Sequence, residues 1–484
     1  MKLRELVTNI RILGGNADLD MEIGGVSYDS RQTRPGDLFV AVRGFETDGH
    51  RFIGSAVKNG AAAVLCERPG EGDAPYLLVE DGRLALAFAS RALFQNPSDG
   101  MCMIGITGTN GKTTSSYLIK HLLETELGAR VGLIGTNGIM IGDELLPSDH
   151  TTPESYELQK LFRRMADAGC SHVVMEVSSH SLALGRVAGI RFQVGLYTNL
   201  TQDHLDFHST MGDYAAAKRK LFAQCDAACV NIDDPWAGYM MENVTCPVLR
   251  FSAEKNEAEL IAKDIRLSAS GVRFAAVGGG EIALTRLAIP GMFSVHNALG
   301  VIAVGQTLGL GLARCAEALA TAHGVKGRVE SVPTDGDYTI LIDYAHTPDA
   351  LENVLKTLKP LTRGRLVSLF GCGGDRDRGK RPQMGAISEK YADLSIVTSD
   401  NPRTEDPEAI IRDILEGMKA RRGTVKVITD RVEAIHWAMD NAQSGDVILL
   451  AGKGHEDYQV VGREKHHMDE REIVAEYIER RKKA

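Results

Sequence analysis

A glycine-rich segment, residues 108–114 (Gly-Thr-Asn-Gly-Lys-Thr-Thr), lies between an apolar run and a helical pattern. The run Met101–Thr107 has the length and composition of a buried strand, and residues 112–127 predict an amphipathic helix. A strand, a glycine-rich loop and a helix in this order predict an α/β fold whose loop N–H groups bind phosphate. Lys112 is then expected to bridge the outer phosphates of ATP, and Thr113 to bind Mg²⁺.

The segment departs from the strict phosphate-loop pattern, because Ile106 stands where the first glycine of GxxxxGK[ST] belongs. Its position between a strand and a helix nevertheless favours phosphate binding over a chance match. The first four residues recur at 135–138 without the Lys-Thr pair, which predicts a tight turn there.

Two turn-rich segments, residues 95–100 and 331–337, each precede an apolar run of the 484-residue chain. They predict three domains, at 1–98, 99–331 and 332–484, of ordinary size. Short β-rich runs alternate with helical stretches in the second and third of these domains. We expect a small α/β N-terminal domain, a central P-loop-type domain with a mainly parallel sheet, and a C-terminal Rossmann-like α/β domain.

Polar sequences follow the apolar runs of both predicted sheets. Ligands of open parallel sheets bind beyond the carboxyl ends of the strands. Six such segments therefore predict a site built from both sheets, and they lie at residues 176–180, 198–199, 343–346, 371–376, 400–403 and 452–456.

Composition excludes several classes of protein. A net charge of −9 argues against a general binder of nucleic acid or of membrane surfaces. No stretch is long enough to span a bilayer, and the N-terminus lacks the apolar core of a signal peptide, so we expect a cytoplasmic protein. The eight cysteines form no CxxC pair and are interpreted as buried free thiols. Cys225 and Cys229 could share a metal, but no second pair follows at zinc spacing.

Four further residues are candidates for metal or phosphate chemistry, and the sequence supports them unequally. Glu176 ends an apolar run, where an unpaired carboxylate is costly unless it binds an ion. His204 and His208 are four residues apart and could face one metal on a helix, although capping or packing is the preferred interpretation of His208. Lys218, taken alone, is interpreted as a solvated lysine of a helix.

The tetrapeptide Asp-Asn-Pro-Arg at 400–403 has two interpretations. Asn-Pro favours a plain β-turn. Alternatively, the guanidinium of Arg403 grips a substrate carboxylate through two charge-assisted hydrogen bonds. A ligand without such a carboxylate would leave the guanidinium unpaired. Asp400 and Glu456 are available for an ammonium group of the ligand.

The glycine-rich segment and five other segments occur in the order found in the Mur ligase family, which the chain resembles over nearly its whole length. Members are cytoplasmic ATP-dependent ligases that add amino acids to the UDP-muramoyl peptide precursor of bacterial peptidoglycan. The shared segments are 108–114, 176–180, 199–205, 214–218, 327–330 and 343–347.

Within the family, Asp-Asn-Pro-Arg is typical of members that add meso-2,6-diaminopimelate to UDP-N-acetylmuramoyl-L-alanyl-D-glutamate. The resemblance implies an acyl phosphate, formed when the substrate carboxylate attacks the γ-phosphate of ATP and then attacked by the incoming amine. It also implies a Mg²⁺ cofactor, a uridine-binding N-terminal domain and no nucleic-acid or membrane partner. We expect a monomer.

The resemblance assigns roles residue by residue. The catalytic residues would be Lys112, Glu176, His204 and Lys218. Magnesium would be bound by Thr113, Glu176, His204 and Lys218, the last as a carbamylated lysine (N6-carboxylysine). ATP would be bound by Gly108, Thr109, Asn110, Gly111, Lys112, Thr113, Thr114, Asn297, Arg328 and Asp343. The muramoyl dipeptide would be bound by Ser30, Thr151, Thr152, Ser178 and Arg186. Diaminopimelate would be bound by Arg376, Asp400, Asn401, Arg403, Gly452 and Glu456.

Three alternatives stay open at this point. The first is another member of the same family, which adds lysine or D-alanyl-D-alanine. The second is a switch-type nucleotide-binding protein, which would not need Glu176 or His204. The third is a ligase similar to folylpolyglutamate synthase, a group that lacks the uridine-binding first domain.

Overall fold

The computed structural model describes residues 1–44, 47–69, 74–148, 150–204, 207–322, 324–418 and 424–483. The chain forms two compact units, one of Met1–Ile261 with Leu299–Cys315, the other of Ala262–Ala298 with Ala316–Ala484. Within the described ranges, no helix has the length and apolar character needed to cross a membrane.

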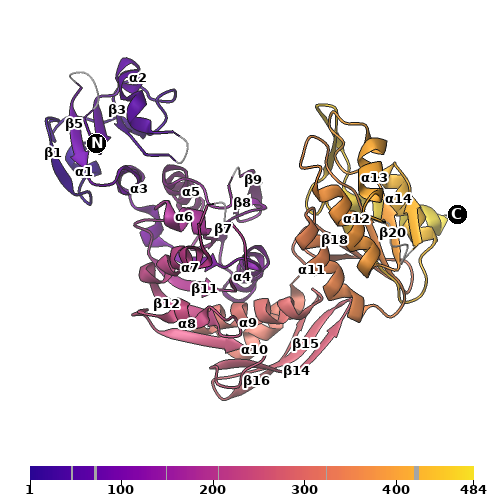
Figure 1. The fold of residues 1–484 in the computed structure, drawn as a ribbon. Coiled ribbons are helices and arrows are strands. Elements are labelled where there is room, and N and C mark those ends of the chain that lie inside the picture. Colours follow the sequence, from indigo (N-terminus) through magenta and orange to yellow (C-terminus); the bar gives the residue numbers. More distant parts are fainter. Residues whose placement is uncertain are drawn as a thin grey trace. The chain divides into compact units, whose positions relative to one another are not determined.

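The first unit begins with a five-stranded sheet in the order β1-β5-β4-β3-β2, in which only β1 runs antiparallel (Figure 1). Helix α3 buries its apolar face, including Leu86, against this sheet. The strands are β1 (Ile12–Gly15), β2 (Gly25–Ser27), β3 (Asp37–Val40), β4 (Ala63–Cys66) and β5 (Tyr76–Val79). The helices are α1 (Leu3–Leu6), α2 (Ile53–Lys58) and α3 (Gly82–Leu93).

The first unit continues with a larger sheet in the order β13-β12-β11-β6-β10-β7-β8-β9. The six strands from β13 to β7 are parallel, whereas β8 and β9 add an antiparallel edge. Its strands are β6 (Cys102–Thr107), β7 (Val131–Gly135), β8 (Gly138–Ile141), β9 (Glu144–Leu146), β10 (His172–Glu176), β11 (Phe192–Tyr197), β12 (Cys225–Asn231) and β13 (Val248–Ser252). Its helices are α4 (Lys112–Leu127), α5 (Ser155–Asp167), α6 (Ser179–Ala183), α7 (Met211–Arg219) and α8 (Ala237–Met241).

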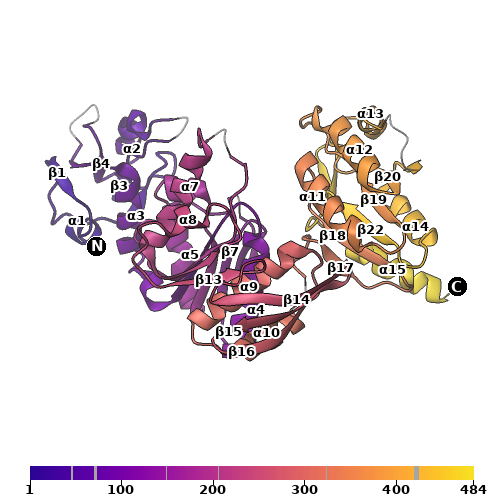
Figure 2. The same ribbon diagram turned by 60° about the horizontal axis from the view of Figure 1, so that its bottom comes forward.

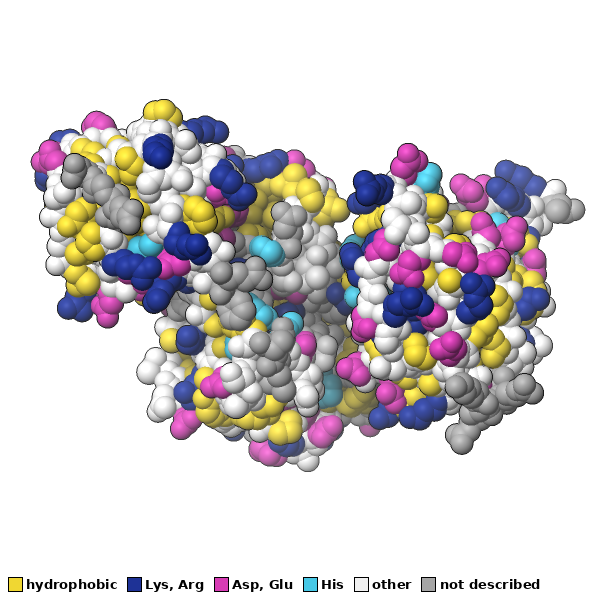
Figure 3. Space-filling view, turned by 45° about the horizontal axis from the view of Figure 1, so that its top comes forward, with side chains coloured by type: hydrophobic (Ala, Val, Ile, Leu, Met, Phe, Trp, Pro, Cys, Tyr) yellow, Lys and Arg dark blue, Asp and Glu magenta, His cyan; other side chains and the backbone are white. Residues whose placement is uncertain are grey.

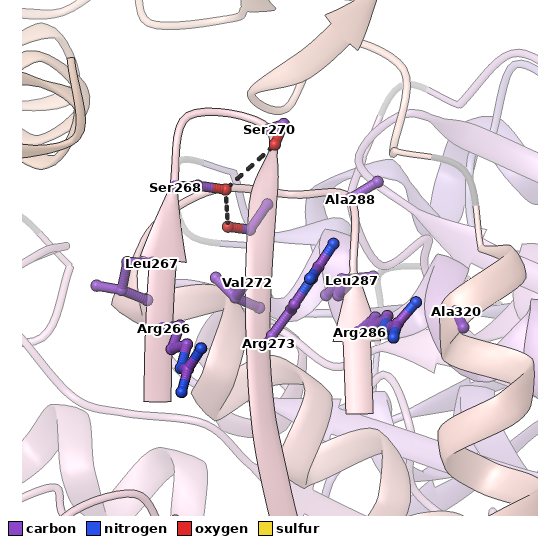
Figure 4. A pocket seen from close by; sticks show the side chains of 11 residues that line it. Arg266, Leu267, Ser268, Ser270, Val272, Arg273, Arg286, Leu287, Ala288 and Ala320 are labelled. Carbon is purple, nitrogen blue, oxygen red and sulfur yellow. Dashed lines mark hydrogen bonds between the residues drawn. The ribbon is translucent and has the colours of Figure 1, made fainter. Parts of the chain in front are cut away.

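Three elements are divided between the units: β14 (Leu260–Ser268), α9 (Met292–Thr307) and α10 (Leu312–Thr321). In the second unit, β15 (Gly271–Gly278) and β16 (Glu281–Leu287) form an antiparallel hairpin beside β14. A shallow pocket of about 390 Å³ lies against these strands, and Figure 4 shows Arg266, Arg273 and Arg286 along it.

The rest of the second unit is a sheet in the order β17-β18-β22-β19-β20-β21, in which only β17 is antiparallel (Figure 2). Helices α11, α12 and α13 pack side by side, and α14 packs beside α15. The strands are β17 (Glu330–Val332), β18 (Thr339–Asp343), β19 (Leu366–Phe370), β20 (Leu394–Val397), β21 (Thr424–Val427) and β22 (Val447–Ala451), with a separate hairpin of β23 (Tyr458–Val461) and β24 (Glu464–His467). The helices are α11 (Pro348–Leu358), α12 (Lys380–Tyr391), α13 (Pro407–Leu415), α14 (Arg431–Asp440) and α15 (Glu470–Lys483).

The predicted α/β fold class is confirmed, and so is the position of the polar segments. Each follows the carboxyl end of a parallel strand: 176–180 ends β10, 343–346 ends β18, 371–376 follows β19 and 452–456 follows β22. Each sheet therefore gathers its polar loops at one edge. The limits of the three expected domains, at residues 98 and 331, stay a prediction.

Candidate active site

The glycine-rich segment connects β6 to α4 as predicted. Ile106 lies inside β6 and is fully buried, so the strand simply continues past the place of the missing glycine. Gly108 has a φ of +150°, and a Cβ there would overlap the hydroxyl of Thr198. Only glycine fits this position, because the loop passes against the end of β11.

Lys112 folds back over the loop. Its ammonium donates hydrogen bonds to the carbonyl oxygens of Gly108 and Thr109, at 2.9 and 2.8 Å. The backbone N–H of Asn110 donates to the side chain of Asn199 at 2.9 Å, which ties the loop to the segment after β11. The loop therefore presents a cation and a helix N-terminus at one place, which is the arrangement that binds phosphate.

Glu176 is 1% exposed at the end of β10. One carboxylate oxygen accepts the backbone N–H of Thr136 at 2.9 Å, and the other accepts the hydroxyl of Thr136 at 3.2 Å. The turn at 135–138 is confirmed as the link between β7 and β8, but its second residue also orients the carboxylate. Sequence reasoning missed this role, because the two residues are 40 positions apart.

Lys218 is 1% exposed, so its interpretation as a solvated lysine is wrong. Its ammonium donates to the carbonyl oxygen of Gly108 at 2.7 Å and lies 4.5 Å from the centre of the Tyr214 ring. Burial, reinforced by the charge of Lys112, lowers the pKa of Lys218 well below its usual value. A lowered pKa increases the neutral fraction of an amine, and a neutral amine is nucleophilic.

His204 and His208 do not share a helix in the described part of this stretch, so that geometric expectation is wrong. The ring of His204 is partly exposed, 4.9 Å from the ring of His180. The ring of His208 is buried against Tyr214 at 5.2 Å, and burial lowers its pKa to about 4. Packing is therefore confirmed as the role of His208.

The residues expected to bind the dipeptide lie around Glu176. The hydroxyl of Thr151 is 3.0 Å from that of Thr136, and Thr152 donates to the backbone oxygen of Glu176 at 2.8 Å. Ser178 donates its N–H to the hydroxyl of Thr152, and Arg186 donates to the carbonyl of Thr152 at 3.0 Å. The structure thus brings Thr151, Thr152, Ser178 and Arg186 together with the carboxylate.

Two cavities of the first unit adjoin this group. One of about 660 Å³ includes Glu154 and Arg186 among its lining residues, and one of about 800 Å³ includes Asp29 and Arg31. Tyr28 and Lys160 line both. Ser30 is buried between the lining residues Asp29 and Arg31, and its carbonyl accepts a hydrogen bond from Asn59 at 2.7 Å.

In the second unit, Asp343 and Arg328 meet at the end of β18. The carboxylate of Asp343 accepts the N–H groups of Val329 and Ala345, at 2.8 and 2.9 Å. Burial raises the pKa of Asp343, and the nearby Arg328 opposes the rise. The buried Nε of Arg328 has no hydrogen-bond partner among the described residues, so this donor fits an anionic ligand. Asn297, on the second-unit part of α9, is also buried.

Asp400–Arg403 follows β20 and contacts the loop after β19. Arg403 adopts a φ of +50°, and its guanidinium donates one hydrogen bond, to the carbonyl of Gly374 at 2.9 Å. Its other donors have no partner among the described residues, so they are available to a planar carboxylate. The backbone of Arg403 is held by Val460 and Gly462 of the β23 hairpin, at 3.1 and 2.8 Å.

Lys453 contacts the residues expected to bind the incoming amino acid, but sequence reasoning did not assign it to that site. Asn401 donates to the carboxylate of Glu456 at 2.9 Å. The fully buried Lys453 donates to both Asn401 and Glu456 at 2.9 Å, and also to the carbonyl of Tyr458. The signal available in the sequence was a lysine between two glycines, directly after a buried strand. Arg376 is exposed and donates to the carbonyl of Asp375, and Gly452 has a φ of +112°.

Magnesium fits this donor set. Among the described residues, no group of three or more His, Cys, Asp or Glu side chains could hold a metal by itself. Mg²⁺ commonly binds through one or two carboxylates together with substrate phosphates and water, so a complete protein cage is not required. Glu176 is hydrogen-bonded only to Thr136 among the described side chains and keeps lone pairs for an ion.

The surface agrees with the charge argument from the sequence. On the face drawn in Figure 3, acidic and basic side chains are interspersed on each unit, without a broad field of one sign.

All eight cysteines are free thiols, and burial raises the pKa of Cys229, so a shared metal with Cys225 has no support.

Comparison with known protein families gives three matches that together cover most of the chain. The description "Mur ligase family, catalytic domain" matches residues 22–92. "Mur ligase middle domain" matches residues 106–305, and "Mur ligase, glutamate ligase domain" matches residues 327–454.

Curated relatives and a solved structure are similar over the full length. A protein of Caldanaerobacter subterraneus subsp. tengcongensis, named UDP-N-acetylmuramoyl-L-alanyl-D-glutamate–2,6-diaminopimelate ligase, is 47% identical over 99% of both chains. A protein of the same name from Clostridioides difficile is 43% identical over 99% of both chains. A solved structure with that name superposes with a TM-score of 0.78 and 34% identity, covering 100% of this chain and 99% of the other.

Proposed function

The chain belongs to the Mur ligase family, and from that premise we propose that it joins 2,6-diaminopimelate to UDP-N-acetylmuramoyl-L-alanyl-D-glutamate with conversion of ATP to ADP. The product is a precursor of bacterial peptidoglycan. The observation that carries the choice of amino acid is the guanidinium of Arg403, which donates to the carbonyl of Gly374 and keeps other donors available at the carboxyl edge of the last sheet. Those donors match a distal carboxylate that lysine lacks.

The reaction needs a nucleotide, and the phosphate loop supports its binding. The carboxylate of the dipeptide attacks the γ-phosphorus, an oxygen–phosphorus bond forms, and the bond to ADP breaks. The amine of diaminopimelate then attacks the acyl carbon, the bond to phosphate breaks, the nitrogen loses a proton to water, and an amide remains. Lys112 would stabilise the charge on the outer phosphates during the first step. Most of the remaining contribution is positioning of the reactants.

Thr113, Glu176, His204 and a carbamylated Lys218 would hold Mg²⁺, which when bound neutralises charge on the phosphates. The lowered pKa of Lys218 supports the modification, because a neutral amine can attack CO₂. In that step the N–C bond forms and a proton passes to water. The product is an anion, which would serve as a metal ligand.

The muramoyl dipeptide would lie in the two cavities of the first unit, with its carboxylate near Glu176. Arg186 would bind an acidic group of the dipeptide, although Glu154 now contacts its Nε at 3.3 Å. The segment around Ser30 would hold the uridine. In the second unit, Asn297, Arg328 and Asp343 would bind ATP, and Arg376, Asp400, Asn401, Gly452 and Glu456 would bind diaminopimelate.

We further propose three domains with limits near residues 98 and 331, a monomeric state and a cytoplasmic location. The experiment that tests the function measures phosphate release with ATP, Mg²⁺ and the UDP-muramoyl dipeptide. Release is expected to require meso-diaminopimelate, with lysine a poor substitute. Release without any amino acid would favour a switch-type nucleotide-binding protein, and equal use of lysine would remove the specificity.

A further inference from the structure

Arg381, on the first turn of α12, is fully buried, although a charged side chain rarely is unless it is paired. Its guanidinium binds the carboxylate of Glu405 through two hydrogen bonds, of 2.9 and 2.8 Å. It also donates to Asp413, on α13, at 2.8 Å. In the described part of the chain, no hydrogen bond joins these three side chains to a side chain proposed to bind substrate, so the function does not explain why a charge is buried here.

The partners of Arg381 join two loops. Glu405 closes the loop after β20, and its carboxylate also accepts the backbone N–H of Asp375, in the loop after β19, at 2.6 Å. The carboxylate of Asp375 returns to the first loop, where it accepts the N–H and hydroxyl of Thr404, at 3.2 and 2.8 Å. Arg381, Glu405, Asp375 and Thr404 therefore form a continuous chain of polar contacts, which we call the loop clamp.

The loop clamp adjoins the residue whose guanidinium we assign to the distal carboxylate. Arg403 precedes Thr404, and its guanidinium donates to the carbonyl of Gly374, the residue before Asp375. The two loops approach so closely that a Cβ on Gly374 would overlap the carbonyl of Pro402. A change in the spacing of the loops would therefore move Arg403 directly.

Two residues, Asp375 in the clamp and Arg403 directly before it, have backbone conformations that are unfavourable without support. Arg403 has a φ of +50° and Asp375 a φ of +53°, in the left-handed region that ordinary residues rarely adopt. Such conformations persist when surrounding contacts over-determine them. The clamp supplies these contacts, since Glu405 holds the N–H of Asp375 and Asp375 holds the residue after Arg403.

We propose that Arg381 is a positioning residue for diaminopimelate: through Glu405 and Asp375 it fixes the spacing of the two loops and so the place of the Arg403 guanidinium. The inference rests on the proposed function and deepens it. A planar guanidinium is needed because one group must bind Glu405 in two bonds and Asp413 in a third. A lysine at this position keeps the charge but cannot make the three contacts together.

The test compares Arg381→Met and Arg381→Lys with wild type in steady-state kinetics for each of the three substrates. We expect KM for diaminopimelate to rise about tenfold or more, because small misplacements of a binding group weaken it strongly. KM for ATP and for the muramoyl dipeptide should change less than about twofold, and Lys should rescue less than half of the loss. Equal rises in all three KM values, or a fall in Tm with unchanged KM, would overturn the proposal.

The matched control is Arg365→Met, in the same sheet at the amino end of β19. Arg365 binds the buried carboxylate of Asp446 at 2.7 Å, so its loss also breaks a partly buried ion pair. We expect a lower Tm but an unchanged KM for diaminopimelate. A rise in KM equal to that of the Arg381 variants would mean that general destabilisation accounts for both.

A second pair of variants tests the proposal if the Arg381 variants do not fold. Glu405→Ala and Asp413→Ala each remove one carboxylate from Arg381, but only Glu405 also accepts the backbone N–H of Asp375, whereas Asp413 pairs with Arg378 later in the same loop. The proposal expects the larger rise in KM for diaminopimelate from Glu405→Ala, and equal rises would contradict it. If wild type does not use diaminopimelate, the proposed function fails. If wild type uses it but Glu405→Ala and Asp413→Ala raise KM equally, only the positioning role fails.

Discussion

Replacing Arg403 tests the choice of amino acid at the residue proposed to make it. In Arg403→Ala the site loses two charge-assisted hydrogen bonds to the distal carboxylate, a loss of about 3 kcal/mol for a partly desolvated pair. At about 1.4 kcal/mol per factor of ten, kcat/KM for diaminopimelate should fall about 100-fold. Arg403→Lys keeps the charge without the fork, and a loss of about tenfold is expected.

Backbone strain at this position is the same in the two variants. Both keep a side chain at a φ of +50°, so the difference between Lys and Ala reports on the side-chain charge, and the difference between wild type and Lys reports on the guanidinium fork. The hydrogen bond from Arg403 to the carbonyl of Gly374 is lost in Ala and can be replaced in Lys. Arg412→Ala is a suitable control, because this exposed arginine lies in the same unit and forms a surface ion pair with Asp406 at 3.5 Å.

The assay measures phosphate release against the concentration of meso-diaminopimelate and, separately, of lysine. The preference for diaminopimelate over lysine should decrease in Arg403→Ala, because lysine has no distal carboxylate to bind the guanidinium. KM for ATP should stay within about twofold of wild type. The reasoning is refuted if Arg403→Ala keeps its preference for diaminopimelate, or if both amino acids lose activity to the same degree.

Three further predictions concern other parts of the molecule. Lys218→Ala should abolish activity, and wild type prepared without CO₂ should recover activity when bicarbonate is added; intact protein mass should show the carbamate, and full activity of the variant would exclude it. Gly108→Ala should lose nucleotide binding in calorimetry, since its Cβ would overlap Thr198; binding like that of wild type would contradict the loop geometry. The pKa of Glu405 is lowered to about 2, mainly by Arg381, so its contribution to stability is present above about pH 4.3 and is lost as the pH falls toward 2. The Tm deficit of Glu405→Gln should therefore be constant from about pH 7 to about pH 5 and shrink below it, and a deficit that does not depend on pH would contradict the ion pair.

The sequence predicted the sheets well because buried strands and turn residues are local signals. The run Met101–Thr107 was expected as a strand and forms β6, Cys102–Thr107, almost to the residue. Parallel strands then placed the polar loops at one edge without further information. The phosphate loop was predicted for the same reason, since its strand, glycines and helix are adjacent in the chain.

Burial of individual charges was not predictable from local patterns. Lys218 lies on α7 after three alanines, but it is buried and its ammonium donates to Gly108, 110 positions away. Arg381 lies in a strongly basic stretch and looks like a surface residue, yet Glu405 and Asp413 reach it from another helix and loop. Neither pairing has a local signal, because each depends on how distant elements pack.

The most direct test of the central claim is a competition between the two amino acids. The protein is incubated with ATP, Mg²⁺, UDP-N-acetylmuramoyl-L-alanyl-D-glutamate and equal concentrations of meso-diaminopimelate and lysine, and the products are identified by mass. We predict one dominant product, the UDP-muramoyl tripeptide that contains diaminopimelate. A product that contains mainly lysine, or no amide product while ATP is consumed, would contradict the account.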